Sequence, residues 1–225
     1  AFWIAADESG VGPENVTMHQ TYVGGGFGRR VYGNDVRMVV AVAKKFPGRP
    51  VQVIWQREEM TRQGRYRSTI GGKFRAGLDA NGMPVAIRAR VASGPDLFTF
   101  GLTDSPYFIS AIKNSRIDVN TVPLHIMTGP YRGPGYNALP FLIASFLAEC
   151  AHAAGKDPME YRLKLAENWP DPGWTKVLKE VGQQSGWGKP LPNGMAQGIA
   201  VGRWGAEKGK PETGTLTLDA HHEGG

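Results

Sequence analysis

The sequence contains very little cysteine and no long hydrophobic run. Its single cysteine, Cys150, excludes an internal disulfide framework and a zinc or iron–sulfur site built from several cysteines. No apolar stretch approaches the roughly 18 residues that a membrane-spanning helix needs. Neither paired carboxylates nor a nucleophile with a histidine partner can be recognised, so the sequence predicts no catalytic residue.

The composition is that of an ordinary globular protein with an excess of positive charge and of glycine. Of 225 residues, 41% are hydrophobic and 20% are charged, which excludes a disordered chain and allows one large domain or two small ones. Lys and Arg number 26 against 20 Asp and Glu, and the net charge of +6 suits an anionic ligand, either nucleic acid or a phosphorylated cofactor. The 31 glycines amount to roughly twice the usual share of about 7%, and they cluster at several sites.

Hydrophobic periodicity and turn residues predict a mixture of helices and strands. Asn81-Gly82 tolerates positive φ angles, so residues 73–78 and 85–92 are expected to form a hairpin around this turn, and residues 60–68 a polar surface loop. Further helices are expected at residues 1–10, 34–46, 137–154, from 157 onwards and at 174–185, and further strands at 16–23, 51–55, 117–122, 199–201 and 215–218. The predicted fold class is α+β, with a mixed or antiparallel sheet and helices packed on it.

The helix at residues 137–154 has the most regular pattern, with one apolar face made of Leu142, Phe146, Cys150 and Ala153. The helix that follows is expected to begin at Asp157, with Pro158 in its first position and Glu160 in its first turn.

A glycine-rich loop at residues 24–30 is the sharpest local feature. Four glycines and one phenylalanine stand between a predicted strand and a predicted helix, and such a loop can present backbone amides to an anion. It is not a dinucleotide-binding fingerprint, because Arg29 stands where that pattern needs a glycine, and no Gly-Lys-Ser/Thr follows for a P-loop. From these residues alone, a tight turn that binds no ligand is the alternative.

A second loop lies at residues 128–136. Its prolines restrict the backbone, its glycines allow unusual backbone angles, and it carries Arg132. Its alternative interpretation is a rigid connection with a solvated arginine. Because both loops lead into a helix, a shared ligand is favoured over two coincidences. We therefore expect residues 24–28 and 131–135 to fold toward a common point.

The two loops and the segments between them resemble the molybdenum-binding large subunit of the xanthine dehydrogenase/aldehyde oxidase family. Residues 23–30 resemble its GGGFG loop, and residues 131–135 resemble its Arg loop. Residues 50–59 and 137–165 resemble the strand and the helix pair that follow these loops. The resemblance covers most of residues 13–202. It is greatest to the branch that contains isoquinoline 1-oxidoreductase and membrane-linked aldehyde dehydrogenase.

The resemblance implies which residues hold the cofactor. They are Gly25, Gly26, Phe27 and Gly28 of the first loop, and Tyr131, Arg132 and Gly133 of the second. The implied cofactor is molybdopterin cytosine dinucleotide with molybdenum. Residues 1–225 would all be part of the molybdopterin-binding region, with the glycine loop and strands at about 16–128, a helical part at about 137–188 and a further strand region at about 197–225.

The resemblance also implies a reaction and partners. The whole subunit would be a molybdenum hydroxylase that oxidises an aldehyde or an N-heteroaromatic substrate with oxygen from water. Electrons would pass to the iron–sulfur clusters of a small partner subunit. The implied partners are the rest of the molybdenum subunit, this iron–sulfur subunit and a membrane cytochrome c, and no nucleic acid is expected. Localisation stays open between the bacterial cytoplasm and a periplasmic or membrane-associated place.

Departures from the family pattern limit what the chain can do. The essential glutamate of the family lies in a Gly-Glu-Pro segment, and this sequence contains none. The chain is therefore expected to be an interior piece that is inactive alone, with no catalytic and no metal-ligating residue assigned. Phe98 and Phe100 stand near the place of the xanthine enzymes' substrate arginine, which disfavours a purine substrate. Pro134 replaces an aromatic residue in the second loop.

Two other functions fit the residues. The excess of positive charge also suits a stand-alone basic module that binds a nucleotide or nucleic acid, although the clustered basic and aromatic repeats of single-strand binders are missing. A cofactor-free relative that serves as a scaffold is the second alternative. His19, His125 and His152 are scattered along the chain, so packing or surface roles are favoured over metal binding.

Overall fold

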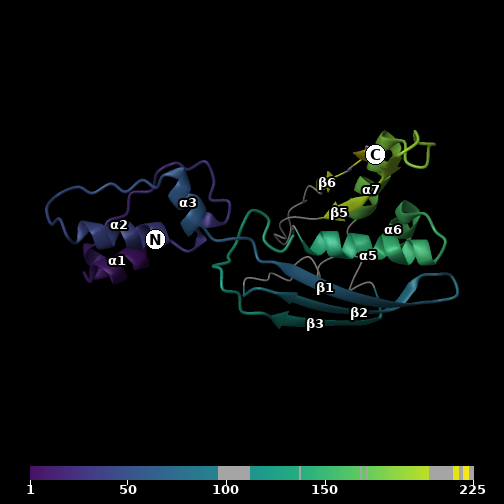
Figure 1. Ribbon diagram of the computed structural model, residues 1–225, viewed down its shortest axis with the longest axis horizontal. Helices are drawn as coiled ribbons and strands as arrows, with labels where there is room; N and C mark the ends of the chain where they lie inside the picture. The colour runs from purple at the N-terminus through teal and green to yellow at the C-terminus, as the bar shows by residue number, and fades with distance from the viewer. Residues whose placement is uncertain are drawn as a thin grey trace. The chain divides into compact units, whose positions relative to one another are not determined.

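The computed structural model describes residues 1–95, 112–136, 138–167, 169–170, 172–202, 215–217 and 220–222 (Figure 1). The chain divides into two compact units. We call residues 1–68 with 124–133 the loop unit, and residues 69–123 with 134–225 the sheet unit. Among the described residues, no helix is both long enough and apolar enough to cross a membrane.

The sheet unit is built on a mixed sheet in the order β1-β2-β3. β1 (Ile70–Leu78) and β2 (Pro84–Ser93) form the predicted antiparallel hairpin, and β3 (Asn114–Thr121) pairs with β2 in parallel. Gly82 in the hairpin turn has a φ of 75°, which the sequence anticipated. The strand expected at 117–122 is present and begins three residues earlier, at Asn114.

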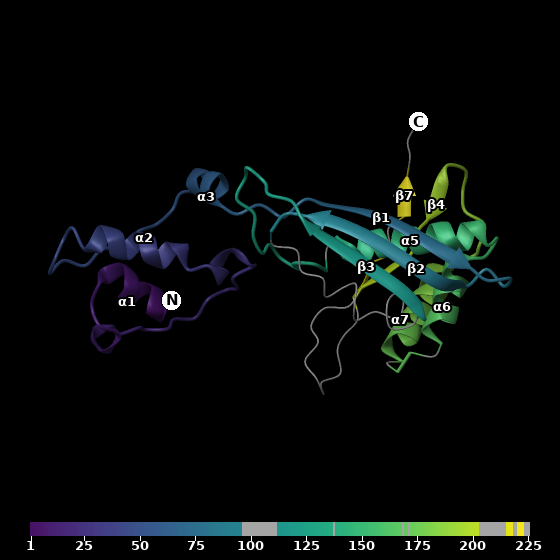
Figure 2. The same cartoon turned by 90° about the horizontal axis from the view of Figure 1, so that it is seen from below.

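Three helices of the sheet unit, α5 (Leu139–Ala153), α6 (Pro158–Ala166) and α7 (Gly173–Ser185), confirm the predicted helical segments. They lie on one side of the sheet, and Figure 2 views the sheet from its other side. The Oδ1 of Asp157 accepts hydrogen bonds from the amides of Met159 and Glu160, so the predicted helix cap is confirmed. Short strands complete the unit: β4 (Met195–Gln197) pairs with β7 (Ala220–His222), and β5 (Ala200–Gly202) with β6 (Thr215–Thr217). The α+β fold is confirmed.

The main hydrophobic core lies between the sheet and α5. The predicted apolar face of this helix is only partly correct, because Ala153 is exposed. The helix buries instead a face rotated toward Leu139, Ile143 and Leu147, together with Cys150. These side chains belong to the same core cluster as Ile87, Ala89 and Val91 of β2. Because most of α5 is apolar, its pattern alone does not decide which face meets the sheet.

A buried arginine joins α5 to α6. Arg162 is 1% exposed, and its guanidinium donates hydrogen bonds to the carbonyl oxygens of Ala144 at 2.7 Å and Pro158 at 2.9 Å. Hydrogen bonds from a charged donor contribute about 1.5–3 kcal/mol each when buried. Arg162 therefore fixes the distance between the two helices as well as filling space.

Replacement of this arginine should destabilise the sheet unit. We expect Arg162→Ala to lower the free energy of unfolding by about 3 kcal/mol, since both hydrogen bonds and the packing of the side-chain stem are lost. Urea denaturation monitored by circular dichroism measures this. Lys179→Ala, at an exposed position of α7, is the matched control and should change stability by less than about 0.5 kcal/mol. Equal stabilities of the two variants would contradict the role given to Arg162.

Burial keeps the thiol of Cys150 and the phenol of Tyr161, two weak acids of the core, in their protonated form. Burial raises the pKa of the Cys150 thiol from 9.0 to about 11, with a smaller effect of Glu149. Burial also raises the pKa of Tyr161 from 10.0 to about 12. The Tyr161 hydroxyl donates a hydrogen bond of 2.9 Å to the carbonyl oxygen of Gly82, which ties α6 to the hairpin turn.

These raised pKa values predict a loss of stability at alkaline pH. Above about pH 9 the unfolded chain releases protons that the folded chain retains, so the free energy of unfolding falls as the pH rises. Tyr161→Phe should cost about 1 kcal/mol at pH 7 through its lost hydrogen bond. The variant should then lose stability less steeply than the wild type between pH 9 and 11. Urea titrations across this pH range test the difference in slope, and parallel curves would show that Tyr161 does not carry it.

The loop unit contains α1 (Phe2–Ser9), α2 (Asn34–Ala43), α3 (Arg57–Gln63) and two short 3₁₀ turns, Pro13–Asn15 and Arg29–Val31. The strands predicted at 16–23 and 51–55 are wrong: both segments lack secondary structure. A strand needs a partner for its backbone groups, and neither segment pairs with another strand among the described residues. The loop predicted at 60–68 is also partly wrong, because α3 extends into it.

The loop unit has almost no core of its own. Ala5 and Ala6 of α1, together with Pro130, have the buried apolar side chains among its described positions. Many of its large apolar side chains are exposed, among them Trp3, Tyr22 and Ile54. Its shape therefore rests on backbone contacts and hydrogen bonds more than on hydrophobic burial.

Candidate site at the two loops

The glycine loop has an unusual backbone. Gly25 and Gly28 have φ angles of 111° and 86°, in the region that favours glycine. Phe27 also has a positive φ, 49°, and no other non-glycine residue of the described chain does. Its side chain is 60% exposed, so the strained conformation is not imposed by packing of the ring. Strain of this kind is frequent at binding sites.

The two loops predicted to share a ligand meet within the loop unit. The amide of Arg132 donates a hydrogen bond of 2.9 Å to the carbonyl oxygen of Phe27. A Cβ atom on Gly28 would lie 2.4 Å from the carbonyl oxygen of Pro130 and 3.0 Å from the amide nitrogen of Tyr131. Only glycine allows this approach, because real Cβ atoms do not come so close to backbone atoms. Gly133 also belongs to this unit, whereas residues 134 and 135 belong to the sheet unit.

Hydrogen bonds with Arg65 and Tyr66 hold the second loop in place. The Tyr66 amide donates to Met127, and the Gly129 amide donates to Tyr66, at 2.9 Å and 3.0 Å. The guanidinium of Arg65 donates to the carbonyl oxygen of Thr128 at 3.0 Å. A Cβ atom on Gly129 would lie 2.5 Å from Cδ of Arg65, so a larger residue there would displace that arginine.

Arginine side chains stack on aromatic rings around both loops. The guanidinium carbons lie 3.8–5.7 Å from the ring centroids in the pairs Arg29–Trp55, Arg65–Tyr32, Arg67–Tyr131 and Arg132–Phe27. Arg67 also donates a hydrogen bond of 3.1 Å to the carbonyl oxygen of Arg132. Sequence reasoning singled out Arg132 and missed the other stacks, because they pair residues that are distant along the chain.

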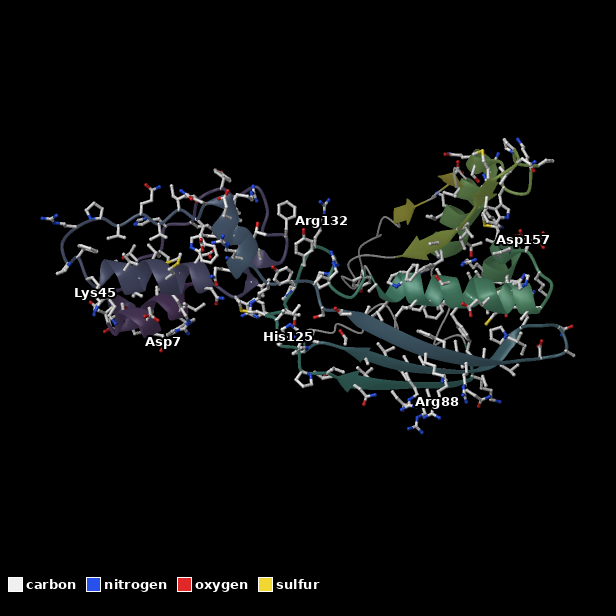
Figure 3. The ribbon with its side chains drawn as sticks, viewed as in Figure 1. Asp7, Lys45, Arg88, His125, Arg132 and Asp157 are labelled. Atoms are coloured by element: carbon white, nitrogen blue, oxygen red, sulfur yellow. The ribbon has the colours of Figure 1, made fainter. Side chains whose placement is uncertain are left out.

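The positive charge of these arginines is largely unbalanced. Among the described residues, the one carboxylate paired with any of them is Asp35, which lies 3.3 Å from Arg29. Arg132 is exposed and is labelled in Figure 3. The arrangement therefore offers an anion several guanidinium groups around a backbone that glycine leaves accessible.

An open pocket of about 350 Å³ lies beside the glycine loop. It is lined by Arg29, Arg30, Asp35, Met38, Val53, Ile54, Trp55 and Met60. A second hollow of about 630 Å³ adjoins it and shares Met38 and residues 53–55. Sequence reasoning missed this pocket because residues 51–55 were expected in a strand. The indole of Trp55 faces Met38, with its Nε1 3.1 Å from the sulfur.

Comparison with known proteins identifies the family. Residues 3–166 match the molybdopterin cofactor-binding domain family. The chain belongs to this family.

Relatives of the molybdopterin-binding chain agree with this. It is 28% identical to the isoquinoline 1-oxidoreductase subunit beta of Brevundimonas diminuta over 87% of the chain and 27% of the relative. It is 25% identical to a membrane-bound aldehyde dehydrogenase of Gluconacetobacter polyoxogenes over 93% of the chain and 31% of the relative. The chain thus spans between a quarter and a third of the length of these relatives. The family resemblance seen in the sequence is confirmed.

The fold of the molybdopterin-binding chain is also similar to that of a solved structure. The aldehyde oxidoreductase of Desulfovibrio gigas superposes with a TM-score of 0.69 at 20% sequence identity, over 89% of this chain and 25% of that protein. At this identity the likeness shows the fold alone.

The residues present fit a phosphorylated pterin. Among the described residues, nothing lies within 4 Å of a Cβ atom placed on Gly24 or Gly133, so the backbone of both loops is open to a ligand there. The arginines nearby supply charge for phosphate. Among the described residues, no group of three or more His, Cys, Asp or Glu could hold a metal ion. The chemistry that the loops offer is therefore backbone hydrogen bonding, positive charge and aromatic surface.

A methyl group at position 28 should separate the two loops. We expect Gly28→Ala to break the hydrogen bond from Arg132 to Phe27, because the new Cβ clashes with Pro130 and φ is unfavourable for alanine. Hydrogen exchange of a peptide covering residues 128–136 should become about tenfold faster. Gly24→Ala is the matched control, since its Cβ has open space. Unchanged exchange in Gly28→Ala would mean that the loops do not depend on this contact.

Proposed function

We propose that the chain supplies two loops of a molybdopterin site in a larger molybdenum hydroxylase subunit. The observation that carries the proposal is the contact of Phe27 and Gly28 with Pro130, Tyr131 and Arg132. It joins two segments about a hundred residues apart, in a chain whose family binds this cofactor. A turn without a ligand would not require both loops at one place.

The proposed cofactor-binding residues come from the two loops. Gly25, Gly26, Phe27 and Gly28 offer the main chain of the first loop, and Tyr131, Arg132 and Gly133 offer that of the second. Arg132 adds a positive charge for a phosphate group. When bound, the cofactor supplies the redox chemistry, and the protein orients it and excludes side reactions. The number of arginines around the loops supports the cytosine dinucleotide form, which carries one phosphate more than molybdopterin alone.

The proposed substrates are aldehydes or N-heteroaromatic compounds, oxidised with oxygen from water. The names of the relatives support this class: one is an isoquinoline oxidoreductase subunit and another is an aldehyde dehydrogenase. A purine is disfavoured by Phe98 and Phe100, which lie outside the described residues. No Gly-Glu-Pro occurs in the sequence, so the catalytic glutamate would come from another part of the subunit.

The remaining assignments concern organisation. We propose that all of residues 1–225 belong to the molybdopterin-binding region, with the glycine loop and strands at about 16–128, helices at about 137–188 and further strands at about 197–225. The match to residues 3–166 supports the larger part of this. The proposed partners are the rest of the subunit, a small iron–sulfur subunit and a membrane cytochrome c. One relative is named as membrane-bound, which favours a periplasmic or membrane-associated place over the cytoplasm.

Cofactor analysis of the full-length protein tests the proposal. The wild type should contain molybdenum and release a cytosine nucleotide on acid hydrolysis, and it should reduce a dye with an aldehyde or isoquinoline as electron donor. Arg132→Gln should lower the molybdenum content several-fold, because it removes a charged contact to phosphate. Arg49→Gln, at an exposed position of the same unit, is the matched control and should retain full content.

Two results would overturn it. A wild-type protein that assembles without molybdenum would indicate a cofactor-free scaffold. Strong, salt-sensitive binding of nucleic acid by such a protein would indicate a basic binding module.

A further inference from the structure

The face of the β1-β2-β3 sheet that points away from the helices is strongly basic. Side chains alternate along each strand, so one set enters the core and the other faces outward. The outward set includes the exposed cations Lys73, Arg75, Arg88, Arg90 and Arg116, which we call the cationic sheet face. Figure 3 shows Arg88 pointing away from α5.

Like charges stand directly opposite one another on this face. In the strand register Lys73 pairs with Arg90, and Arg75 pairs with Arg88. Arg88 in turn pairs with Arg116 of β3, whereas Arg90 stands opposite Asp118. Like charges directly opposite on neighbouring strands destabilise a sheet, and opposite charges stabilise it. This face therefore carries three cross-strand pairs of residues that repel each other. A sheet face that contacts only water is expected to alternate positive and negative side chains instead.

One carboxylate on the face shows what relieves this repulsion. Asp118 accepts hydrogen bonds from Arg88 and Arg116, each at 2.8 Å. The hydrogen bonds from Arg116 and then Arg88 lower the pKa of this carboxyl group from 3.8. Lys73, Arg75 and Arg90 have no ion pair among the described residues. All three are exposed, and Lys73 and Arg75 have no carboxylate opposite them in the strand register, so the face leaves places for further carboxylates.

We propose that the cationic sheet face binds the acidic surface of a separate protein, whose carboxylates pair with Lys73, Arg75 and Arg90 as Asp118 pairs with its two arginines. Guanidinium groups bind carboxylates with directional hydrogen bonds, so several of them in fixed register give orientation as well as attraction. The proposal does not depend on the cofactor assignment, because no residue of the two loops takes part.

Other occupants fit the face less well. A second copy of this chain has a net charge of +6 and would bring like charge to the face. The outward positions of the three strands carry no aromatic residue on which bases could stack, and the Asp118 carboxylate would face the phosphates of a nucleic acid. They also carry no large aliphatic residue, whereas a face covered permanently by the rest of a subunit is more apolar.

Charge reversal in the full-length protein tests the proposal. The variant Lys73→Glu/Arg75→Glu/Arg90→Glu changes three exposed cations that have no ion pair among the described residues. The matched control, Lys176→Glu/Lys179→Glu/Lys189→Glu, alters the net charge by the same amount at exposed positions elsewhere in the sheet unit. The probe is a fluorescent deca-glutamate peptide, with deca-glutamine as its neutral counterpart, and binding is followed by fluorescence anisotropy at 50 and 200 mM salt.

We expect the wild type to bind deca-glutamate but not deca-glutamine, more weakly at the higher salt. The variant of the sheet face should bind at least about tenfold more weakly, and the control variant within about threefold of the wild type. Molybdenum content should be the same in all three proteins, and each should melt in a single cooperative transition, which separates this test from that of the cofactor site.

Four outcomes would overturn the proposal. Equal loss in both variants would mean that only net charge matters. No binding by the wild type would mean that the face is covered by the rest of the chain. Tighter binding of a 20-base-pair DNA duplex than of deca-glutamate, lost in the sheet-face variant, would assign the face to nucleic acid. A concentration-dependent dimer lost in the same variant would assign it to a second copy.

Discussion

The close approach of Gly28 to the backbone of Pro130 and Tyr131 is the constraint on which the candidate site depends. The chain leaves the loop unit after Ser68, forms the β1-β2-β3 sheet, and returns at Leu124. The returning segment passes so close to the first loop that position 28 must be glycine, since any side chain there would occupy the space of the Pro130 carbonyl. With so little buried apolar surface in the loop unit, this contact and the hydrogen bonds around Tyr66 substitute for a core.

Elements that carry their own local signal could be predicted from the sequence. The hairpin depends on Asn81-Gly82, α6 on the cap of Asp157, and α7 ends at Gly186 with a φ of 65°. The strands predicted at 16–23 and 51–55 are absent. Alternation of apolar and polar residues is a property of one segment, and it does not show whether a second strand is available to pair with that segment. α3 was missed for the opposite reason: it is polar, and its acidic first turn, which suits the helix dipole, is a weak signal.

The candidate site could likewise be predicted only where the sequence itself carries a local signal. Glycine and arginine in two loops indicated an anionic ligand, and the family resemblance supplied its identity, which the match over residues 3–166 supports. The stacking of Arg65 on Tyr32 and the pocket beside Trp55 could not be foreseen. Both arise from residues brought together by the path of the chain, and single-sequence patterns contain no information on such pairs.

The near absence of buried side chains in the loop unit has a consequence for assembly. A polypeptide segment gains conformational order only where the contacts formed exceed the entropy that is lost. The sheet unit, with its core between β2 and α5, meets this requirement early, whereas residues 1–68 expose Trp3, Tyr22 and Ile54 to water. The loop unit should therefore acquire its final form last during biosynthesis, and it is the part of the chain most prone to aggregate until its apolar side chains are covered.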